Sequence, residues 1–180
     1  MEGTILTYSK VYFDTMAPEK EMVRIEDIAH ALSLMVRANG HFPEIFSVAQ
    51  HSLQCANEAI ARNYPPRVAL ACLLHDGSEA YLSDITRPVK KNLPAYKDIE
   101  MRLSEAIYDC FLDGPLDEEE ESMVKNIDDT CLYYEFLHFT GIKLNPNAPV
   151  IVSEPEYDFK PMKDVEQEFL WMFKHLMRAL

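Results

Sequence analysis

Basic residues are scarce in this chain relative to acidic ones. Seventeen lysines and arginines stand against 30 aspartates and glutamates, which gives a formal net charge of −13. Such a surface repels the phosphate backbone of DNA or RNA unless a local basic patch intervenes. The sequence offers only a cluster of three, Arg87, Lys90 and Lys91. We therefore expect no nucleic-acid polymer as partner, while a small phosphorylated molecule remains compatible with the charge.

Long apolar runs are missing as well. No stretch approaches the ~20 apolar residues that a membrane span requires. The N-terminal segment MEGTILTYSK lacks the basic flank and the continuous apolar stretch of a secretion signal. We expect no membrane association and a cytoplasmic location.

Closely spaced cysteine pairs are also absent. Cys55, Cys72, Cys110 and Cys131 lie far apart and form no CxxC motif. All four fall within apolar helical patterns, where buried free thiols are common. The spacing favours reduced core thiols over disulfides or a zinc site built on cysteine.

Helical periodicity fills most of the chain. Apolar residues recur three or four positions apart, which predicts helices over 25–37, 48–62, 66–77, 94–112, 117–139 and 163–179. Ser47 and Pro66 suit the first turns of two of them, and Asn39-Gly40 suits the end of the first. Because 66–77 is apolar almost throughout, we expect it to be the central, most buried helix. A shorter helix or turn should follow over 78–83.

Two segments depart from this pattern. Residues 5–14 alternate well enough for a short strand or hairpin arm, and 141–162 holds four prolines with little periodicity. The sequence thus predicts one all-α domain with a small irregular or β-like N-terminal segment. Its core should span about 24–140, followed by a proline-rich arm, 141–162, and a C-terminal helix, 163–180.

Potential metal ligands lie at the end of the apolar helix. The stretch LACLLHDGSEAYLSD places His75 next to Asp76. Neighbouring residues on a helix point about 100° apart, so both reach one ion only near a helix end. Alone, this dipeptide reads more simply as a helix-end histidine beside a solvated aspartate.

Two further helices place ligand-type residues among apolar ones. His51 lies within SVAQHSLQCA, and Asp128 lies between Ile127 and Cys131 in the inward stripe of its helix. Each alone has a simpler explanation as a hydrogen-bonded core residue. Buried carboxylates, however, rarely stand without a partner. One site of His51, His75, Asp76 and Asp128 explains all three helices. Mixed nitrogen and oxygen ligands suit one divalent transition metal: Co, Mn, Zn, Fe or Ni.

The order His, His-Asp, Asp on consecutive helices resembles the HD superfamily of metal-dependent phosphohydrolases. Within it, HDGSEAYLSDITRPVK is similar to the corresponding segment of bacterial 5′-deoxynucleotidases, as are IEDIAHALSLMVRANGH and FSVAQHS. The likeness covers residues 24–138, and nothing in 141–180 contributes to it. It implies an HD-type helical fold with His51, His75, Asp76 and Asp128 as metal ligands. Both the resemblance and the helical register favour Asp128 over the adjacent Asp129.

The resemblance also implies roles for four more residues. Glu79 matches the catalytic acid/base, and Asp84 matches an acid that positions substrate or the attacking water. Arg37 matches an arginine that contacts the phosphate, and Lys90 could add charge there. Glu79, Arg37 and Lys90 could instead be ordinary surface residues. Where the nucleotidases carry an aromatic residue after the arginine, this chain has Ala38.

Three functions follow from these expectations. The first is hydrolysis of the 5′-phosphate from (deoxy)nucleoside monophosphates; the second is release of tripolyphosphate from dNTPs. The few cations near the motif favour the monophosphate. The third is a non-catalytic module with a structural metal, which would need neither Glu79 nor Asp84. By analogy with small HD nucleotidases, a homodimer or higher homo-oligomer is compatible with the sequence.

Overall fold

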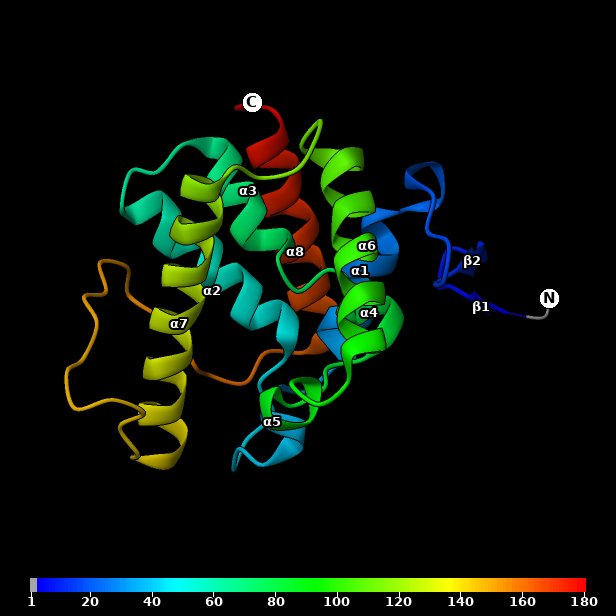
Figure 1. The fold of residues 1–180 in the computed structure, drawn as a ribbon. Coiled ribbons are helices and arrows are strands. Elements are labelled where there is room, and N and C mark those ends of the chain that lie inside the picture. The colour runs from blue at the N-terminus through cyan, green and yellow to red at the C-terminus, as the bar shows by residue number, and fades with distance from the viewer. Residues whose placement is uncertain (1–2) are drawn as a thin grey trace.

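The computed structural model describes residues 3–180, and helices make up most of it (Figure 1). Two short strands, β1 (Thr4–Leu6) and β2 (Tyr12–Asp14), pair antiparallel with Ile5 opposite Phe13. This hairpin projects from the helical body (Figure 1). The structure confirms the expected fold class, an all-α protein with a small β-like N-terminal segment.

The remaining elements follow in chain order. The 3₁₀ helix η1 (Lys20–Met22) precedes α1 (Ile25–Leu34), and a second 3₁₀ segment, η2 (Arg37–Gly40), precedes α2 (Val48–Ala61). Helix α3 (Pro66–Leu74) leads through α4 (Glu79–Leu82) and α5 (Arg87–Lys90) to α6 (Pro94–Phe111). Two long helices, α7 (Glu118–Thr140) and α8 (Met162–Met177), complete the chain. None of these helices is both long and apolar enough to cross a membrane.

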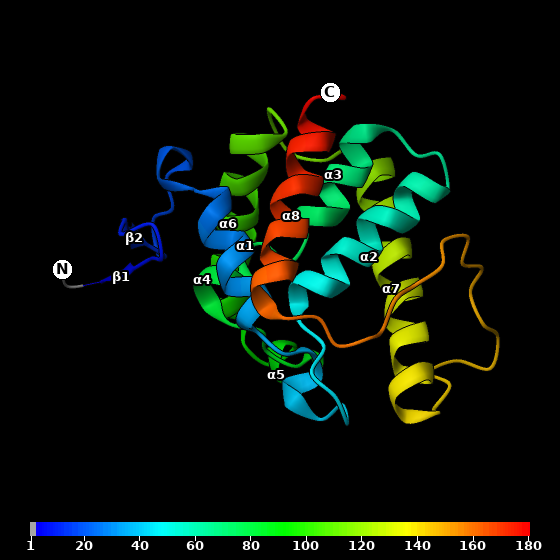
Figure 2. The same cartoon turned by 180° about the vertical axis from the view of Figure 1, so that it is seen from behind.

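Helix α3 lies at the centre of the core. It contacts α2, α7 and α8, and Val68 to Leu74 are all buried. Figure 2 shows α8 beside α1, with α2 and α3 on its other side. The expectation for the apolar segment 66–77 is confirmed in its position, although the helix ends at Leu74.

Local capping fixes where two of the site-bearing helices begin. The hydroxyl of Ser47 accepts a hydrogen bond from Gln50 N, and Gln50 Oε1 accepts one from Ser47 N. Asp117 and Glu120 form the same reciprocal pair at the start of α7. Such boxes satisfy backbone N–H groups that have no partner inside the helix. Ser47 is thus the N-cap that its sequence predicts.

The first helix is shorter than its periodicity predicts. It ends at Leu34, and Met35 and Val36 are extended. Met35 O accepts from Val48 N, and Arg37 N donates to Phe46 O, so this segment pairs with the strand-like approach to α2. The competing backbone pairing ends the helix three residues early. Arg37 consequently lies on η2 and not at the end of α1.

The proline-rich arm is fixed along α2 by a row of polar side chains. Gln50, Gln54, Glu58 and Arg62, spaced four apart, all bond backbone groups between Val150 and Asp158. Residues at this spacing lie on one face of a helix. The arm therefore packs against the same helix that carries His51.

Candidate metal centre

The His75-Asp76 pair lies where α3 ends and the chain turns. His75 is the C-cap of the helix, and Gly77 N donates to Leu74 O at 2.8 Å. A Cβ on Gly77 would lie 2.9 Å from Leu74 O and 3.2 Å from Ile107 Cδ1. Glycine therefore permits the tight turn that releases both side chains from the helix.

Four predicted ligands converge from three parts of the fold. His51 Nε2 lies 3.3 Å from His75 Nε2, 3.2 Å from Asp128 Oδ1 and 3.8 Å from Asp76 Oδ2. His75 Nε2 lies 3.3 Å from Asp76 Oδ2 and 3.8 Å from Asp128 Oδ1. Atoms bound to one ion at about 2.1 Å stand roughly 3.0–3.4 Å apart in octahedral or tetrahedral arrangements. The spacing fits a common ion.

The hydrogen bonds of the two histidines determine which ring nitrogen is free. His51 Nδ1 lies 2.6 Å from Glu135 Oε1, and His75 Nδ1 lies 2.8 Å from Cys72 O. Since a carboxylate and a carbonyl only accept, both Nδ1 atoms donate. In the neutral rings, both Nε2 lone pairs then face each other and the two aspartates. Such a group of electron-rich atoms is stabilised by a cation bound between them.

Unsatisfied polarity at Asp76 points the same way. Its Oδ2 is buried and has no hydrogen-bond partner among residues 3–180. Burial raises the pKa of Asp76, but His75, His51 and Arg37 lower it to a value below the ordinary one. Burial likewise opposes ionisation of Asp128, whereas His51, His75 and Arg37 hold its pKa well below the usual range. Both carboxylates are therefore ionised.

The carboxylates around His51 favour a positive charge on its ring. Burial and Arg37 both lower its pKa, but Glu135 and Asp128 outweigh them and raise it to about 10. The surroundings thus favour positive charge at this point. A proton can supply it, and so can a metal ion.

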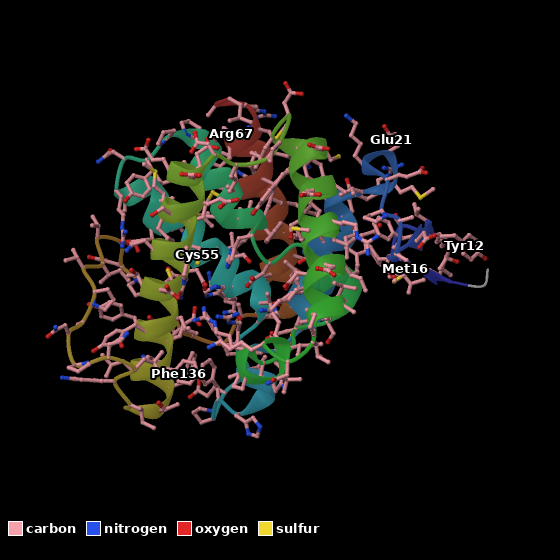
Figure 3. All side chains as sticks on the ribbon, viewed as in Figure 1. Tyr12, Met16, Glu21, Cys55, Arg67 and Phe136 are labelled. Carbon is pink, nitrogen blue, oxygen red and sulfur yellow. The ribbon has the colours of Figure 1, made fainter. Side chains whose placement is uncertain are left out.

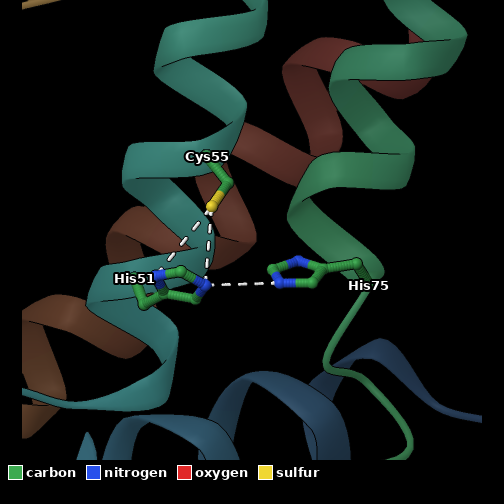
Figure 4. Close-up of side chains that lie close together, drawn as sticks. All are labelled: His51, Cys55 and His75. Atoms are coloured by element: carbon green, nitrogen blue, oxygen red, sulfur yellow. Dashed lines mark hydrogen bonds between the residues drawn. The ribbon is translucent and has the colours of Figure 1, made fainter. Parts of the chain in front are cut away.

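Cys55 offers a different third ligand for a metal. His51, Cys55 and His75 form a group that could hold an ion, shown in Figure 4. Cys55 Sγ lies 3.6 Å from His51 Nε2 and 3.9 Å from Nδ1. Burial raises the pKa of this thiol well above its ordinary value, and Cys131 raises it further. These contacts are compatible with a metal at the two histidines.

Asp129, the neighbour of Asp128 in the sequence, lies outside the cluster of predicted ligands. Asp129 accepts from Lys125 Nζ at 2.6 Å and from Arg87 at 3.3 Å, and its side chain is 45% exposed. Asp128 Oδ2 accepts from the same Arg87 at 2.9 Å, while its Oδ1 faces the histidines.

A cavity of about 350 Å³ opens beside the cluster. It is lined by Arg37, Ala38, Phe42, Asp76, Glu79, Asp84, Ile85, Thr86, Arg87, Pro88, Lys90, Asp128, Leu132 and Phe136. Of the eight site residues that the sequence predicts, all except His51 and His75 line it directly. The volume falls in the range of small-molecule sites.

Glu79 begins α4 and is 5% exposed. Its Oε2 has no hydrogen-bond partner among the described residues, and its Oε1 lies 3.9 Å from Lys90 Nζ. Burial, with Asp76 and Asp84 nearby, raises the pKa of Glu79 to about 9 against the opposing charges of Lys90 and Arg37. Asp84 is half-buried on the same side of the cavity. Glu79 is thus a buried carboxyl that readily holds a proton.

The two predicted phosphate contacts, Arg37 and Lys90, differ in the ion pairs that they form within the protein. The Arg37 side chain is 12% exposed and lies 3.5 Å from both Asp76 Oδ2 and Glu135 Oε2. Burial lowers its pKa, but these carboxylates raise it above the usual range, so its charge is permanent. Lys90 pairs with Glu100 at 2.6 Å. Arg37 is therefore no surface residue, and Lys90 reaches the cavity with its charge largely neutralised.

Sequence reasoning missed Glu135, which is fully buried and contacts both His51 and Arg37. The signal was present, because Ile127, Cys131 and Glu135 are spaced four apart and belong to one inward stripe of α7. An acid in such a stripe requires a partner. Phe136, the next residue of α7, is half-buried and lines the cavity.

Comparisons with known proteins place the chain among relatives without an assigned activity. No protein-family model matches it. It is 37% identical to the uncharacterized protein YfdR of Escherichia coli (strain K12) over 103 residues, 57% of this chain and only 55% of YfdR. It is 30% identical to an uncharacterized protein of Rhodobacter capsulatus over 181 aligned positions, 93% of this chain and 92% of that protein. The chain therefore belongs to the same family as the Rhodobacter capsulatus protein.

Proposed function

We propose that the chain is an HD-type, divalent-metal phosphohydrolase that removes the 5′-phosphate from nucleoside monophosphates. One observation carries the proposal: Nε2 of both His51 and His75 lies within 3.8 Å of Asp76 Oδ2 and Asp128 Oδ1, beside a cavity that Glu79 and Arg37 also line. A structural metal site needs no such cavity, no protonatable Glu79 and no guanidinium beside the ligands. The sequence resemblance to HD nucleotidases supports the same reading.

The metal ligands in this proposal are His51, His75, Asp76 and Asp128, and Cys55 is not one of them. The sulfur is nearly equidistant from both nitrogens of His51, so it lies beside the ring. An ion held by His51 would lie beyond Nε2, along its lone pair, where Asp128 and His75 already converge. The raised thiol pKa of Cys55 also disfavours the thiolate that binds metals.

When bound there, a divalent ion would supply Lewis acidity for a phosphoryl oxygen and for the water that attacks phosphorus. Glu79 takes the proton from that water and returns it to the O5′ leaving oxygen as the P–O5′ bond breaks. Its raised pKa suits the donation to O5′, and the charge of a bound cation would favour the ionised form that accepts the first proton. Arg37 holds the phosphate with a fixed, forked charge. Asp84 lies near Glu79 in the same cavity and positions the substrate or the attacking water.

The two alternative functions expected from the sequence explain the site less well. Release of tripolyphosphate from dNTPs would need extra cations for two more phosphates, but Lys90 is already paired with Glu100 and Arg87 with Asp128 and Asp129. A non-catalytic metal module does not explain why Glu79 Oε2 is buried with no hydrogen-bond partner among the described residues.

The test is a hydrolysis screen of the purified full chain loaded separately with Mn²⁺, Co²⁺ or Zn²⁺. Nucleoside monophosphates and dNTPs are supplied in parallel, and released phosphate and tripolyphosphate are measured. We expect metal-dependent release of phosphate from the monophosphates, and none from a His75→Ala variant. Tripolyphosphate from dNTPs, or no hydrolysis with any metal, would contradict the proposal.

A further inference from the structure

The cavity beside the metal centre has an aromatic end. Phe42 and Phe136 both line it, with ring centroids 5.2 Å apart and an interplanar angle of 77°. Phe42 is buried and stacks on Phe139 at 4.6 Å, so it is held from behind. Phe136 is half-buried, on the lower part of α7 in Figure 3. One more side chain, Ala38, packs against this aromatic cluster and also lines the cavity.

Helix α7 arranges the cavity wall in a fixed order. Asp128, Leu132 and Phe136 are spaced four apart and line the same cavity, so one face of α7 forms its side. At 1.5 Å rise per residue, Phe136 lies about 12 Å along the helix axis from Asp128. The wall therefore runs from a charged end, through an apolar middle, to an aromatic end.

The charged end is where cations gather. Arg37 and Arg87 approach Asp76 and Asp128 there. The residues of the aromatic end, Ala38, Phe42, Leu132 and Phe136, are all apolar. A ligand that fits both ends carries phosphate at one end and a flat ring at the other. A spacer comparable in length to a pentose joins the two.

Resting on the phosphohydrolase function proposed above, we propose that Phe136, supported by Phe42, is the platform on which the base of a nucleoside 5′-phosphate stacks. Stacking on an aromatic ring tolerates every base, because each has a π-face. The side chains of Ala38, Phe42, Leu132 and Phe136 at this end carry no group that hydrogen-bonds the edge of a base. The enzyme should thus require a base without choosing strongly among bases.

The test compares two substrates that differ only in the base: thymidine 5′-monophosphate and 2-deoxyribose 5-phosphate. The metal-loaded full chain, Phe136→Ala and Phe136→Trp are assayed, with Phe159→Ala as the matched control, since Phe159 is 54% exposed and does not line the cavity. Phe136→Ala should lower kcat/KM for the nucleotide about 5- to 150-fold and leave the base-free phosphate unchanged. Phe136→Trp should recover the loss.

A binding measurement separates this inference from the function on which it rests. The 5′-methylenephosphonate analogue of thymidine monophosphate has a P–C bond that resists hydrolysis. Calorimetric titration with it measures how much Phe136 contributes to binding when no turnover occurs. We expect weaker binding by Phe136→Ala and parental binding by Phe159→Ala.

The outcomes are distinct. Hydrolysis that is equally fast with and without the base, or an equal loss on both substrates in Phe136→Ala, would overturn the platform while leaving the phosphohydrolase intact. Hydrolysis of neither substrate, together with analogue binding that depends on Phe136, would overturn the proposed reaction and keep the platform. An analogue that does not bind, with no hydrolysis, would end both.

Discussion

Glu135 couples two halves of the site through one carboxylate. Its Oε1 accepts from His51 Nδ1 at 2.6 Å, and its Oε2 lies 3.5 Å from Arg37. By accepting from Nδ1, Glu135 keeps the His51 lone pair on Nε2, aimed at Asp128 and His75. Such outer contacts orient a metal-binding ring and raise its basicity.

Replacing Glu135 by glutamine should therefore weaken metal binding about 10- to 100-fold without unfolding the protein. The amide keeps the shape of the side chain but loses the charge. Calorimetric titration with Co²⁺ measures the affinity. The matched control is Glu166→Gln, because Glu166 pairs with His30 Nδ1 at 3.0 Å on the surface, away from the cluster. Equal Co²⁺ affinity in Glu135→Gln and the parent would refute this role.

Glu79 should act in the reaction and not in metal binding. Its oxygens are absent from the converging cluster, and among residues 3–180 its Oε2 has no hydrogen-bond partner. Glu79→Gln should lower kcat by about 10²-fold or more while the metal content, measured by elemental analysis, stays that of the parent. If the glutamine variant turns over at the parental rate, Glu79 is not the proton carrier.

The sequence was most informative where a polar residue interrupts an apolar stripe. His51 and Asp128 could be identified because burying either one alone is costly. Arg37 was harder to place, since the backbone pairing of Met35 with Val48 ends α1 at Leu34, and periodicity carries no information about such a pairing. Phe42 belongs to a loop, so no helical pattern marked it as a cavity residue.

At the scale of elements, the arm is attached to α2 chiefly through Glu58. This buried carboxylate accepts from Val152 N, Ser153 N and Ser153 Oγ, and from Arg62 Nε within α2. Burial alone would raise the pKa of Glu58, but these hydrogen bonds lower it below its ordinary value. Its contribution to stability is therefore full above about pH 4.5. As pH falls through the lower folded pKa, the contribution is lost.

We expect Glu58→Gln to loosen the arm at neutral pH and to remove part of the acid sensitivity of its attachment. Hydrogen exchange of the amides of Val152 and Ser153 measures both effects. In the parent, protection of these amides should fall only below about pH 4.5, whereas in the variant it should be low throughout. Glu156→Gln, which changes an arm residue that is 72% exposed, serves as the control. Unchanged protection in Glu58→Gln would show that the arm is held by its other contacts.

The arm also shows the limit of prediction at this scale. Its four prolines indicated a non-helical arm, and the described residues between α7 and α8 form no helix or strand. The row of Gln50, Gln54, Glu58 and Arg62 that holds it could not be recognised as a binding stripe. A polar face on a helix ordinarily faces water, and only the tertiary fold brings a backbone segment onto it. Helical periodicity did not reveal the short helix α5, whose Pro88 lies in the first turn, where proline is tolerated.

For the whole molecule, a bound metal should add to the free energy of unfolding. Without it, two ionised aspartates depend on a proton at His51 for compensating charge, in a protein of net charge −13. At a free metal concentration of 100 times Kd, binding contributes about 2.7 kcal/mol, or roughly 5–10 °C in Tm for a chain of this length. Thermal unfolding of the chelator-treated chain with and without Co²⁺ measures the shift, and Ca²⁺, which prefers oxygen ligands, should give a smaller one. An equal shift in His75→Ala would contradict binding at this centre.

The central claim, a single divalent ion held by His51, His75, Asp76 and Asp128, is tested most directly by X-ray absorption spectroscopy of the zinc-loaded full chain. Our account predicts one zinc per chain with a coordination shell of nitrogen and oxygen alone, at about 2.0–2.2 Å. A sulfur neighbour at about 2.3 Å would show that Cys55 is a ligand. That result, or a chain that retains no zinc, would contradict the account.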